Sequence, residues 1–228
     1  QLVLREVPIA EPKAGEVLVH VRAATTCGTD LKAFLRGHPQ IPMPGVFGHE
    51  YAGVVERVGE GAKFREGDEV MGVHSAPCQH CSWCLNGQEN LCESIMATKV
   101  LGSFAEYLLI PERIANLNLH PKPKEIDFFR ASLLEPLACV VQALSDAKRI
   151  IGDRSHLRWL ILGPGAVGLL FVAAIKYLGL GHVDLAGRNR VRLAVGGSLG
   201  ANILKLTDIQ NQPQYDVGVE CVGLIETW

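Results

Sequence analysis

The chain has 228 residues, of which 48% are hydrophobic and 20% are charged, and its formal net charge is −2. These proportions are ordinary for a soluble globular protein. The small net charge argues against a broad basic surface for nucleic acid or anionic membrane. The length corresponds to one large domain or two ordinary ones.

The first part of the chain is predicted to be rich in β-structure. Short apolar segments with partial alternation are interpreted as strands at residues 17–23, 52–58, 69–73 and 105–110. Glycine and proline separate these segments and provide turns. Short strands with such turn signals are typical of a barrel-like or sandwich domain, which we assign to residues 1–133.

Two short motifs in this part carry candidate metal ligands. The sequence CGTD contains Cys27, and the sequence GHE contains His49 and Glu50. Another candidate, Glu135, lies in LEPLAC at the predicted end of the domain. A lone cysteine or histidine is usually a core residue, but together these motifs supply a thiolate, an imidazole and a carboxylate. A catalytic zinc ion takes three protein ligands and keeps one position open.

Four of the seven cysteines lie close together in CQHCSWCLNGQENLC, namely Cys78, Cys81, Cys84 and Cys92. Disulfides would need an oxidising compartment, and an odd number of cysteines in a chain of this size is not a typical disulfide framework. The spacing between the third and fourth cysteines is also too long for the bacterial ferredoxin pattern. Four thiolates close a tetrahedron around zinc, so we predict a structural zinc site in a lobe at about residues 76–95. Because a zinc site and not a disulfide framework is predicted, we also expect the protein to be cytoplasmic.

The second part of the chain, residues 134–228, alternates strands and helices. A helix is predicted at 133–147, where the chain crosses between the domains, followed by strands at 159–162, 182–186 and 216–221. Helices are predicted at 166–178 and 190–199, and the first of them is apolar almost all round, so we expect it to be buried. This alternation predicts a parallel, doubly wound sheet. The uncharged run 159–175 is long enough to resemble a short membrane span, but Gly163-Pro164-Gly165 interrupts it.

That interruption is a candidate phosphate-binding loop. The sequence LGPGAVG places Gly163, Gly165 and Gly168 in the G-x-G-x-x-G spacing between a predicted strand and a predicted helix. The first glycine makes the tight turn, the second lets the backbone approach a pyrophosphate, and the third lets helix and strand pack closely. The helix begins at Ala166 and Val167, where its free N–H groups and its dipole favour an anion.

The residue that distinguishes NAD from NADP is expected about twenty positions further on, at the end of the second strand. No carboxylate stands there, because the sequence continues with Gly187 and Arg188. Asp184 is the nearest acid, but it lies two or three residues too early. Glycine leaves room, and the arginine offers a fork to a 2′-phosphate, so the pattern favours NADP over NAD.

The motifs in this order resemble those of the zinc-dependent medium-chain dehydrogenases, the alcohol and sorbitol dehydrogenase superfamily. The resemblance covers essentially the whole chain and rests on CGTD, GHEYAGVVERVGEGAKFREGDEV, the four-cysteine segment, EPLAC and LGPGAVG. It implies a GroES-like, β-rich catalytic domain followed by a Rossmann-type α/β domain. The chain ends just after a predicted strand, so we expect this second domain to be incomplete at its C-terminus.

The resemblance also implies roles for the metal-site residues. Cys27 and His49 correspond to the fixed ligands of the catalytic zinc. The third ligand is either Glu50 or Glu135, and the sequence does not choose between them. Cys139, close to Glu135 in the chain, is expected to be a small buried thiol and no ligand.

A proton path is implied around the same motif. Thr29 corresponds to the hydroxyl that takes the proton of the substrate alcohol, while hydride passes to the nicotinamide. Asp30 corresponds to the carboxylate that orients His49 through its far ring nitrogen. Many alcohol dehydrogenases have a histidine where this chain has Lys32, so the outer part of the path is left open.

The function implied is an NAD(P)-dependent zinc oxidoreductase with two zinc ions per chain, acting on a secondary alcohol, most simply a polyol or sugar. An aldose 1-dehydrogenase and a simple alcohol dehydrogenase of the same superfamily are alternatives. From other classes, a zinc-stabilised binding module without catalysis and a zinc-ribbon nucleic-acid binder are alternatives too. The partners expected are a small-molecule substrate and further copies of the chain in a dimer or tetramer, with no nucleic acid or membrane.

Overall fold

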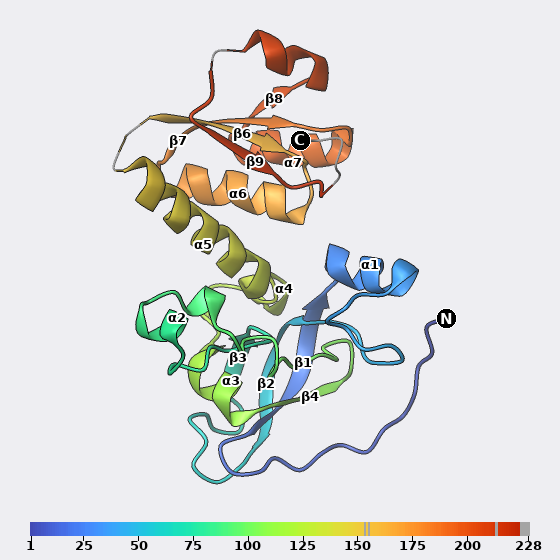
Figure 1. Ribbon diagram of the computed structural model, residues 1–228. Helices are drawn as coiled ribbons and strands as arrows, with labels where there is room; N and C mark the ends of the chain where they lie inside the picture. Colours follow the sequence, from blue (N-terminus) through green and yellow to red (C-terminus); the bar gives the residue numbers. More distant parts are fainter. Residues whose placement is uncertain (153, 155, 213, 224–228) are drawn as a thin grey trace. The chain divides into compact units, whose positions relative to one another are not determined.

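The computed structural model describes residues 1–152, 154, 156–212 and 214–223. The chain divides into two compact units, Gln1–Glu135 and Pro136–Trp228. In Figure 1 the first unit is coloured from blue to yellow-green and the second from yellow to red. The predicted domain boundary, between residues 133 and 134, lies two residues before this division. The last five residues of the predicted second domain, 224–228, lie outside the described residues.

An antiparallel sheet forms the centre of the first unit (Figure 1). Among the described residues its strand order is β4-β1-β2-β3-β5. The four predicted strands are present as β1 (Val17–Thr25), β2 (Glu50–Val58), β3 (Glu69–Gly72) and β4 (Tyr107–Ile110). The short strand β5 (Leu119–Pro121) was not predicted, because three residues are too few to show a period of two.

The inner face of this sheet carries the hydrophobic core of the first unit. Alternate residues of β1, Val17 and Val19, are buried with Tyr51 and Val55 of β2, as the pleat of a strand requires. Ile114 packs on the same core from the short helix α3 (Glu112–Leu117). Full burial of side chains of this size contributes about 1.5–3 kcal/mol each.

Four more short helical segments surround this sheet. They are α1 (Gly28–Arg36), α2 (Ser82–Leu85), the 3₁₀ turn η1 (Glu89–Leu91) and α4 (Phe128–Ala131). Helix α1 connects the end of β1 to the loop that leads to β2, whereas α2 and η1 lie inside the four-cysteine segment. Both regions therefore position candidate metal ligands.

The second unit has a parallel sheet, as the alternation of strands and helices predicted. Its described strands run in the order β8-β7-β6-β9. They are β6 (Leu157–Leu162), β7 (Gly181–Ala186), β8 (Asn202–Leu204) and β9 (Val217–Glu220). Numbered within the unit this order is 3-2-1-4, which is how the doubly wound dinucleotide-binding sheet begins. The predicted fold class, a β-rich GroES-like domain followed by a Rossmann-type domain, is confirmed.

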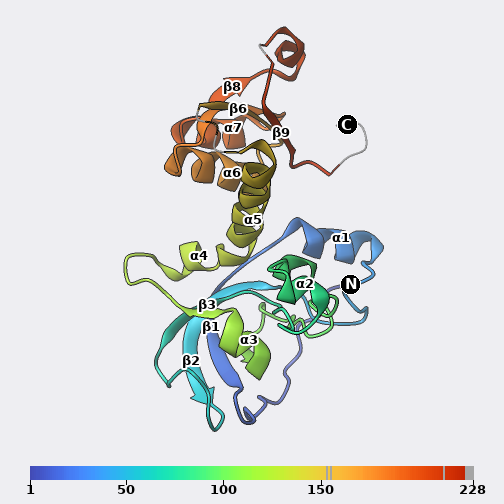
Figure 2. The ribbon, with the colours of Figure 1, turned by 60° about the vertical axis from the view of Figure 1, so that its left-hand side comes forward.

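Helices pack on this sheet from one side. Helix α6 (Ala166–Tyr177) buries Phe171, Val172 and Ile175 against side chains of β6 and β7, and α5 (Leu134–Ile151) adds Val140 and Leu144 to the same core. Helix α7 (Arg190–Ser198) follows β7. The 3₁₀ turn η2 (Leu206–Asn211) lies on the opposite side of the sheet from α6 in both Figure 1 and Figure 2.

Two predictions about burial in this unit are wrong. Helix α6 is not buried all round, because Val167 and Tyr177 are exposed. Cys139 is exposed as well. Its place on α5 lies outside the stripe of buried residues that runs through Pro136, Val140 and Leu144 at intervals of four. Among the described residues, no helix is both long and apolar enough to cross a membrane.

Candidate functional site

The start of α1 is organised by the CGTD motif. Cys27 is the N-cap residue, and its sulfur accepts the backbone N–H of Thr29 at 3.5 Å. In return, the Asp30 carboxylate accepts the backbone N–H of Cys27 at 3.0 Å, which completes a capping box. The motif therefore fixes the thiol at a helix N-terminus, where the helix dipole favours the thiolate.

Strand pairing brings the two candidate motifs together. β1 and β2 are antiparallel neighbours, and Thr25 at the end of β1 is opposite Glu50 at the start of β2. Cys27 follows the end of β1, and His49 directly precedes β2, so both lie at the same end of the strand pair. The ligand atoms of Cys27, His49 and Glu50 all lie within 4.8 Å of one another. This is a candidate metal centre with a sulfur, a nitrogen and an oxygen ligand, a donor set that suits zinc.

Charges around this centre favour the metal-binding form of the cysteine. A hydrogen bond with His49 lowers the pKa of the Cys27 thiol, against the effect of burial. Burial lowers the pKa of His49, but its partners Cys27 and Asp30 outweigh this effect and raise the pKa to about 9. His49 and Asp30 are both buried, with Nδ1 of the ring 3.5 Å from Oδ1 of the carboxylate. Asp30 therefore lies beside His49 in the structure, as predicted.

The two glutamates differ in their surroundings. Glu50 is 4% exposed and accepts a hydrogen bond from the Thr25 hydroxyl. Glu135 is not part of the close group of ligand atoms; its Oε1 lies 3.4 Å from Nδ1 of His74. Geometry therefore places Glu50, and not Glu135, with Cys27 and His49 in this arrangement of the side chains.

His74 is a site residue that the sequence did not reveal. Its ring meets the ring of His49 edge to face, with 5.2 Å between the centroids. Its buried Nδ1 is not aligned for a hydrogen bond to Glu135 and has no such partner among the described residues. A single histidine after a predicted strand is no signal by itself; only the pairing of β3 with β2 brings it beside the GHE motif.

Thr29 and Lys32 lie on α1, close to the same centre. Thr29 is half-buried in the first turn, next to Cys27, whereas Lys32 is exposed. The threonine is therefore positioned beside a candidate ligand. No described contact carries a proton path further through Lys32.

The four cysteines of the second candidate site converge. Sγ of Cys84 lies 3.9 Å from that of Cys78 and 3.6 Å from that of Cys81. In a tetrahedron with zinc–sulfur bonds of about 2.3 Å, the sulfur atoms are about 3.8 Å apart. The ligand atoms of Cys78, Cys81, Cys84 and Cys92 lie within 4.8 Å of one another. The donor set and its spacing fit a closed zinc site.

Backbone N–H groups point at these sulfur atoms. Sγ of Cys92 accepts the N–H of Cys78 at 3.2 Å, and Sγ of Cys78 accepts the N–H of Cys81 at 3.2 Å. Burial raises the pKa of the Cys92 thiol, but the N–H groups of Cys78 and Ser94 outweigh it and lower the pKa to about 6. The folded backbone therefore favours the thiolate of Cys92, the form that zinc requires. Burial and the hydrogen bond with Cys81 act the other way on Cys84 and raise the pKa of its thiol to about 12.

The glycine loop of the second unit has the geometry expected of a dinucleotide fingerprint. Gly163 has φ +105°, which a side chain would strain, and a Cβ atom on Gly168 would stand 2.0 Å from the carbonyl oxygen of Gly163. A Cβ atom on Gly165, in contrast, would meet nothing within 4 Å. Gly165 is also the N-cap residue of α6, which begins with Ala166 and Val167. The loop therefore leaves open space at a helix N-terminus, where a phosphate binds well.

This loop lines a cleft of about 980 Å³ at the carboxyl ends of β6 and β7. Gly187 and Arg188, which directly follow β7, line the same cleft, as does Arg192 of α7. Arg188 is exposed, and α7 begins beside it with the Asn189 side chain accepting the N–H of Arg192. The sequence did not single out Arg192, because it lies inside a predicted helix that gave no reason to expect it at the cleft.

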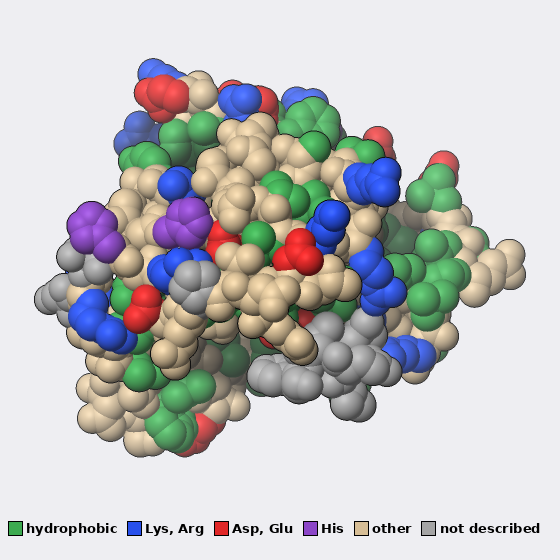
Figure 3. Space-filling model, turned by 90° about the horizontal axis from the view of Figure 1, so that it is seen from above, with side chains coloured by type: hydrophobic (Ala, Val, Ile, Leu, Met, Phe, Trp, Pro, Cys, Tyr) green, Lys and Arg blue, Asp and Glu red, His purple; other side chains and the backbone are tan. Residues whose placement is uncertain are grey.

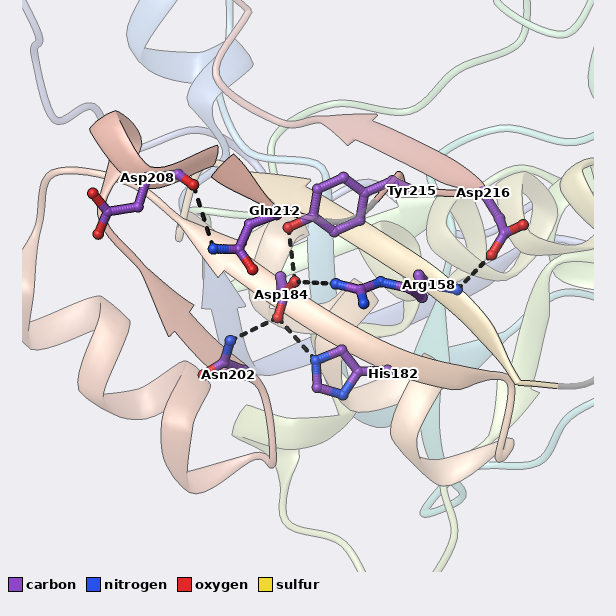
Figure 4. A network of polar contacts seen from close by, with 8 residues as sticks. All are labelled: Arg158, His182, Asp184, Asn202, Asp208, Gln212, Tyr215 and Asp216. Atoms are coloured by element: carbon purple, nitrogen blue, oxygen red, sulfur yellow. Dashed lines mark hydrogen bonds and ion pairs between the residues drawn. The ribbon is translucent and has the colours of Figure 1, made fainter. Parts of the chain in front are cut away.

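Asp184 is engaged elsewhere and does not face this cleft. It is 1% exposed, and its carboxylate accepts hydrogen bonds from Tyr215 at 2.7 Å and from Asn202 at 2.8 Å, with His182 at 2.9 Å (Figure 4). Arg158 adds an ion pair at 3.5 Å. The carboxylate therefore holds β6, β7, β8 and the approach to β9 together. This agrees with the sequence-based conclusion that Asp184 lies too early to hold a ribose.

Basic side chains do not gather in one patch on the face seen in Figure 3. Lys and Arg are scattered there among Asp, Glu and uncharged side chains. This face gives no support to a nucleic-acid or anionic membrane partner, whose footprint is a continuous basic stripe.

Comparison with known proteins identifies the family. Residues 13–124 match the alcohol dehydrogenase GroES-like domain. The chain is 34% identical to L-threonine 3-dehydrogenase of Bacillus velezensis, over 88% of this chain and 57% of that protein. It is 34% identical to D-altritol 5-dehydrogenase of Agrobacterium fabrum, over 87% of this chain and 58% of that protein.

A solved structure agrees over both units. The zinc-binding dehydrogenase of Sinorhizobium meliloti, bound to NADP, is 28% identical with a TM-score of 0.83. The match covers 98% of this chain and 67% of that one. The chain belongs to the zinc-dependent medium-chain dehydrogenase superfamily. It spans somewhat more than half the length of the two curated relatives.

Proposed function

We propose that the protein is a zinc-dependent oxidoreductase that transfers a hydride between NAD(P) and a secondary alcohol, giving the ketone. The convergence of Cys27, His49 and Glu50 at the start of β2 is the observation that carries this proposal. Three ligand groups at one strand end, with Thr29 beside them, form a metal site to which a small alcohol can bind. A binding module that needed zinc only for stability would require the four-cysteine site alone.

Each side chain of the site has a proposed role. Cys27, His49 and Glu50 hold the metal, and Glu135 is an alternative ligand. Asp30 keeps the imidazole of His49 oriented, and Thr29 receives the proton of the substrate hydroxyl. When bound, zinc polarises the substrate oxygen and the nicotinamide accepts the hydride. The second zinc, held by Cys78, Cys81, Cys84 and Cys92, has a structural role.

In the second unit, the dinucleotide is proposed to bind across the glycine loop. Gly163, Gly165 and Gly168 shape the loop, and the N-terminus of α6 at Ala166 and Val167 receives the pyrophosphate. Gly187 and Arg188 line the same cleft with Arg192, so two guanidinium groups are available to a 2′-phosphate. We therefore propose NADP as the preferred cofactor.

The substrate is proposed to be a polyol, sugar or other multiply substituted secondary alcohol. The names of the relatives point to such substrates, threonine in one case and altritol in another. We further propose a catalytic GroES-like domain over 1–133 and a Rossmann domain over 134–228, assembled as a homo-oligomer in the cytoplasm. Zinc-bound thiolates suit a reducing compartment.

A substrate panel with the zinc-loaded protein tests the function. Secondary alcohols, polyols, aldoses and amino alcohols are offered with NAD and with NADP, and reduced cofactor is recorded by absorbance. Replacing Thr29 by Val is expected to lower kcat about 10²- to 10⁴-fold, the usual contribution of a positioned proton acceptor, while Thr29→Ser retains most of it. Full zinc loading without cofactor reduction by any alcohol would instead favour the binding module.

A further inference from the structure

Arg113 reaches both ends of the four-cysteine segment from outside it. The residue lies in the first turn of α3, and its Nε donates to the carbonyl oxygen of Pro77 at 2.8 Å. Nη2 donates to the carbonyl oxygen of Ala76 at 2.6 Å. The same nitrogen lies 3.9 Å from Sγ of Cys92 and 3.4 Å from Oγ of Ser94. One guanidinium group therefore joins the chain that enters the segment to the chain that leaves it.

The group is held on a rigid base. Ile114 and Ala115, the next residues of α3, are completely buried in the core of the first unit. Ala76 is completely buried as well. The planar fork of an arginine can serve two carbonyl groups and a thiolate at once, which a lysine ammonium on a flexible stem does less well. The position of Cys92 relative to Cys78 is thereby tied to the core.

Charge adds a second effect. Four thiolates around a zinc ion carry a net charge of about −2. The acidic side chains in the segment and directly after it, Glu89 and Glu93, are exposed and add negative charge. Among the described residues, Arg113 is the cationic side chain whose contact with a cysteine sulfur of this group is shown. Its positive charge therefore partly neutralises the negative charge of the Cys92 thiolate.

We propose that Arg113 is a positioning residue of the four-cysteine site, which sets how tightly that site holds its metal. This inference rests on the proposed zinc at the site. Arg113 acts through Cys92 and through the peptide groups before Cys78. Partners of this kind change metal affinity about 10- to 100-fold when they are removed. The inference concerns the structural site and predicts nothing about the chemistry at Cys27 and His49.

The test compares Arg113→Met and Arg113→Lys with Arg130→Met, which removes an exposed arginine of the same unit. The zinc-loaded proteins are mixed with a chelator, and alkylation of Cys81 and Cys84 is followed by mass spectrometry, which reports this site alone. We expect Arg113→Met to lose zinc about 10- to 100-fold more readily. Arg113→Lys keeps the charge but not the planar fork, so its rate of zinc loss is expected to lie between those of Arg113→Met and the parent. Arg130→Met is expected to lose zinc at the parent's rate.

Absorption spectra of the cobalt-loaded proteins provide a second measurement. The thiolate-to-cobalt band of Arg113→Met is expected to differ from that of the parent, because one sulfur has lost its partner. Unchanged zinc retention and an unchanged band in both Arg113 variants would overturn the proposal. If zinc does not protect Cys81 and Cys84 in the parent protein, the structural zinc of the proposed function fails as well. The two failures are thus told apart.

Discussion

Oδ1 of Asp30 lies 3.5 Å from Nδ1 of His49 and accepts the backbone N–H of Gly48 at 3.2 Å. The other oxygen of the same carboxylate accepts the N–H of Cys27. One side chain therefore orients the ring of one proposed ligand and holds the backbone of another. Helix capping and the proposed metal binding therefore depend on the same residue.

Replacing Asp30 by Asn is expected to weaken metal binding at the Cys27 and His49 site about 10- to 100-fold, because the ring loses its charged partner. Zinc titration against a chromophoric chelator measures the change. Asp127→Asn is the matched control, since Asp127 also caps a helix, α4, but its carboxylate contacts Arg130 and none of the candidate ligands. Equal affinities in the two variants would show that Asp30 acts only as a cap.

The two proposed zinc ions are expected to differ in lability. Elemental analysis of well-loaded protein should give two zinc ions per chain, since one site is closed by four thiolates and the other keeps an open position. Dialysis against a chelator should then abolish activity before the segment around Cys84 unfolds. Cys84→Ser is expected to lower the zinc content to about one ion per chain and to destabilise the protein. A zinc content of only one ion per chain in the well-loaded parent protein would contradict this prediction.

Arg188→Ala is expected to raise the KM for NADP far more than that for NAD. A charge-assisted hydrogen bond contributes about 1.5–3 kcal/mol, so the ratio of the two kcat/KM values should change about ten- to a hundredfold. Arg190→Ala is the control, because Arg190 is exposed at the start of α7 but does not line the cleft. Equal effects on both cofactors would rule out a 2′-phosphate contact.

Two glycines of the loop are expected to respond differently to alanine. Gly165→Ala should leave the free energy of unfolding nearly unchanged, because the added methyl group meets nothing within 4 Å and φ is −77°. It should nevertheless weaken NADP binding, since the methyl group occupies the space left for the pyrophosphate. Gly168→Ala should destabilise the protein, because the methyl group would stand 2.0 Å from a carbonyl oxygen. Urea unfolding and fluorescence titration with NADPH separate the two effects.

Asp184 is expected to make stability depend on acid pH. Burial raises the pKa of its carboxyl group, but hydrogen bonds from Asn202, Tyr215 and His182 outweigh burial and lower the pKa below its ordinary value. The carboxylate therefore stabilises the fold above the pKa of the unfolded chain, about 3.9, and this contribution is lost as pH falls through the lower folded pKa. Asp184→Asn should cost about 1–3 kcal/mol near pH 7.

The cost of Asp184→Asn should shrink toward pH 3, where the parent protein loses the same contribution. Urea unfolding at the two pH values measures it. Asp208→Asn, a change at a half-buried carboxylate of η2 that accepts a hydrogen bond from the Thr207 hydroxyl, serves as the control. A cost that stays constant across this pH range would show that the charge of Asp184 does not stabilise the fold.

Much of the fold could be predicted because apolar segments separated by glycine and proline are strong signals. Four strands of the first sheet and the alternation in the second unit follow directly from them. Helix α1 was not predicted, since its N-cap is Cys27 and not one of the usual residues, and its polar face dominates its sequence. Strands β5 and β8 have three residues each, which is too short for any period to appear.

The candidate site was predictable where a motif holds several groups in a fixed spacing. The four cysteines and the loop from Gly163 to Gly168 are of this kind. His74 and Arg113 were not predictable, because each stands alone in the sequence and reaches its partners only through the pairing of distant segments. The choice between Glu50 and Glu135 also depends on side-chain positions that spacing does not encode.

The contact between Gly187 and Pro164 restricts how this protein could change its cofactor. A Cβ atom at position 187 would stand 2.2 Å from Cδ of the Pro164 ring, which has no freedom to rotate away. An acidic residue for a ribose hydroxyl therefore cannot be introduced at 187 by a single substitution without straining the loop. The two positions have to change together, so their effects are strongly non-additive. If NADP is the cofactor as proposed, an evolutionary or engineered path toward NAD has to include the proline, although this residue carries no cofactor-specific group itself.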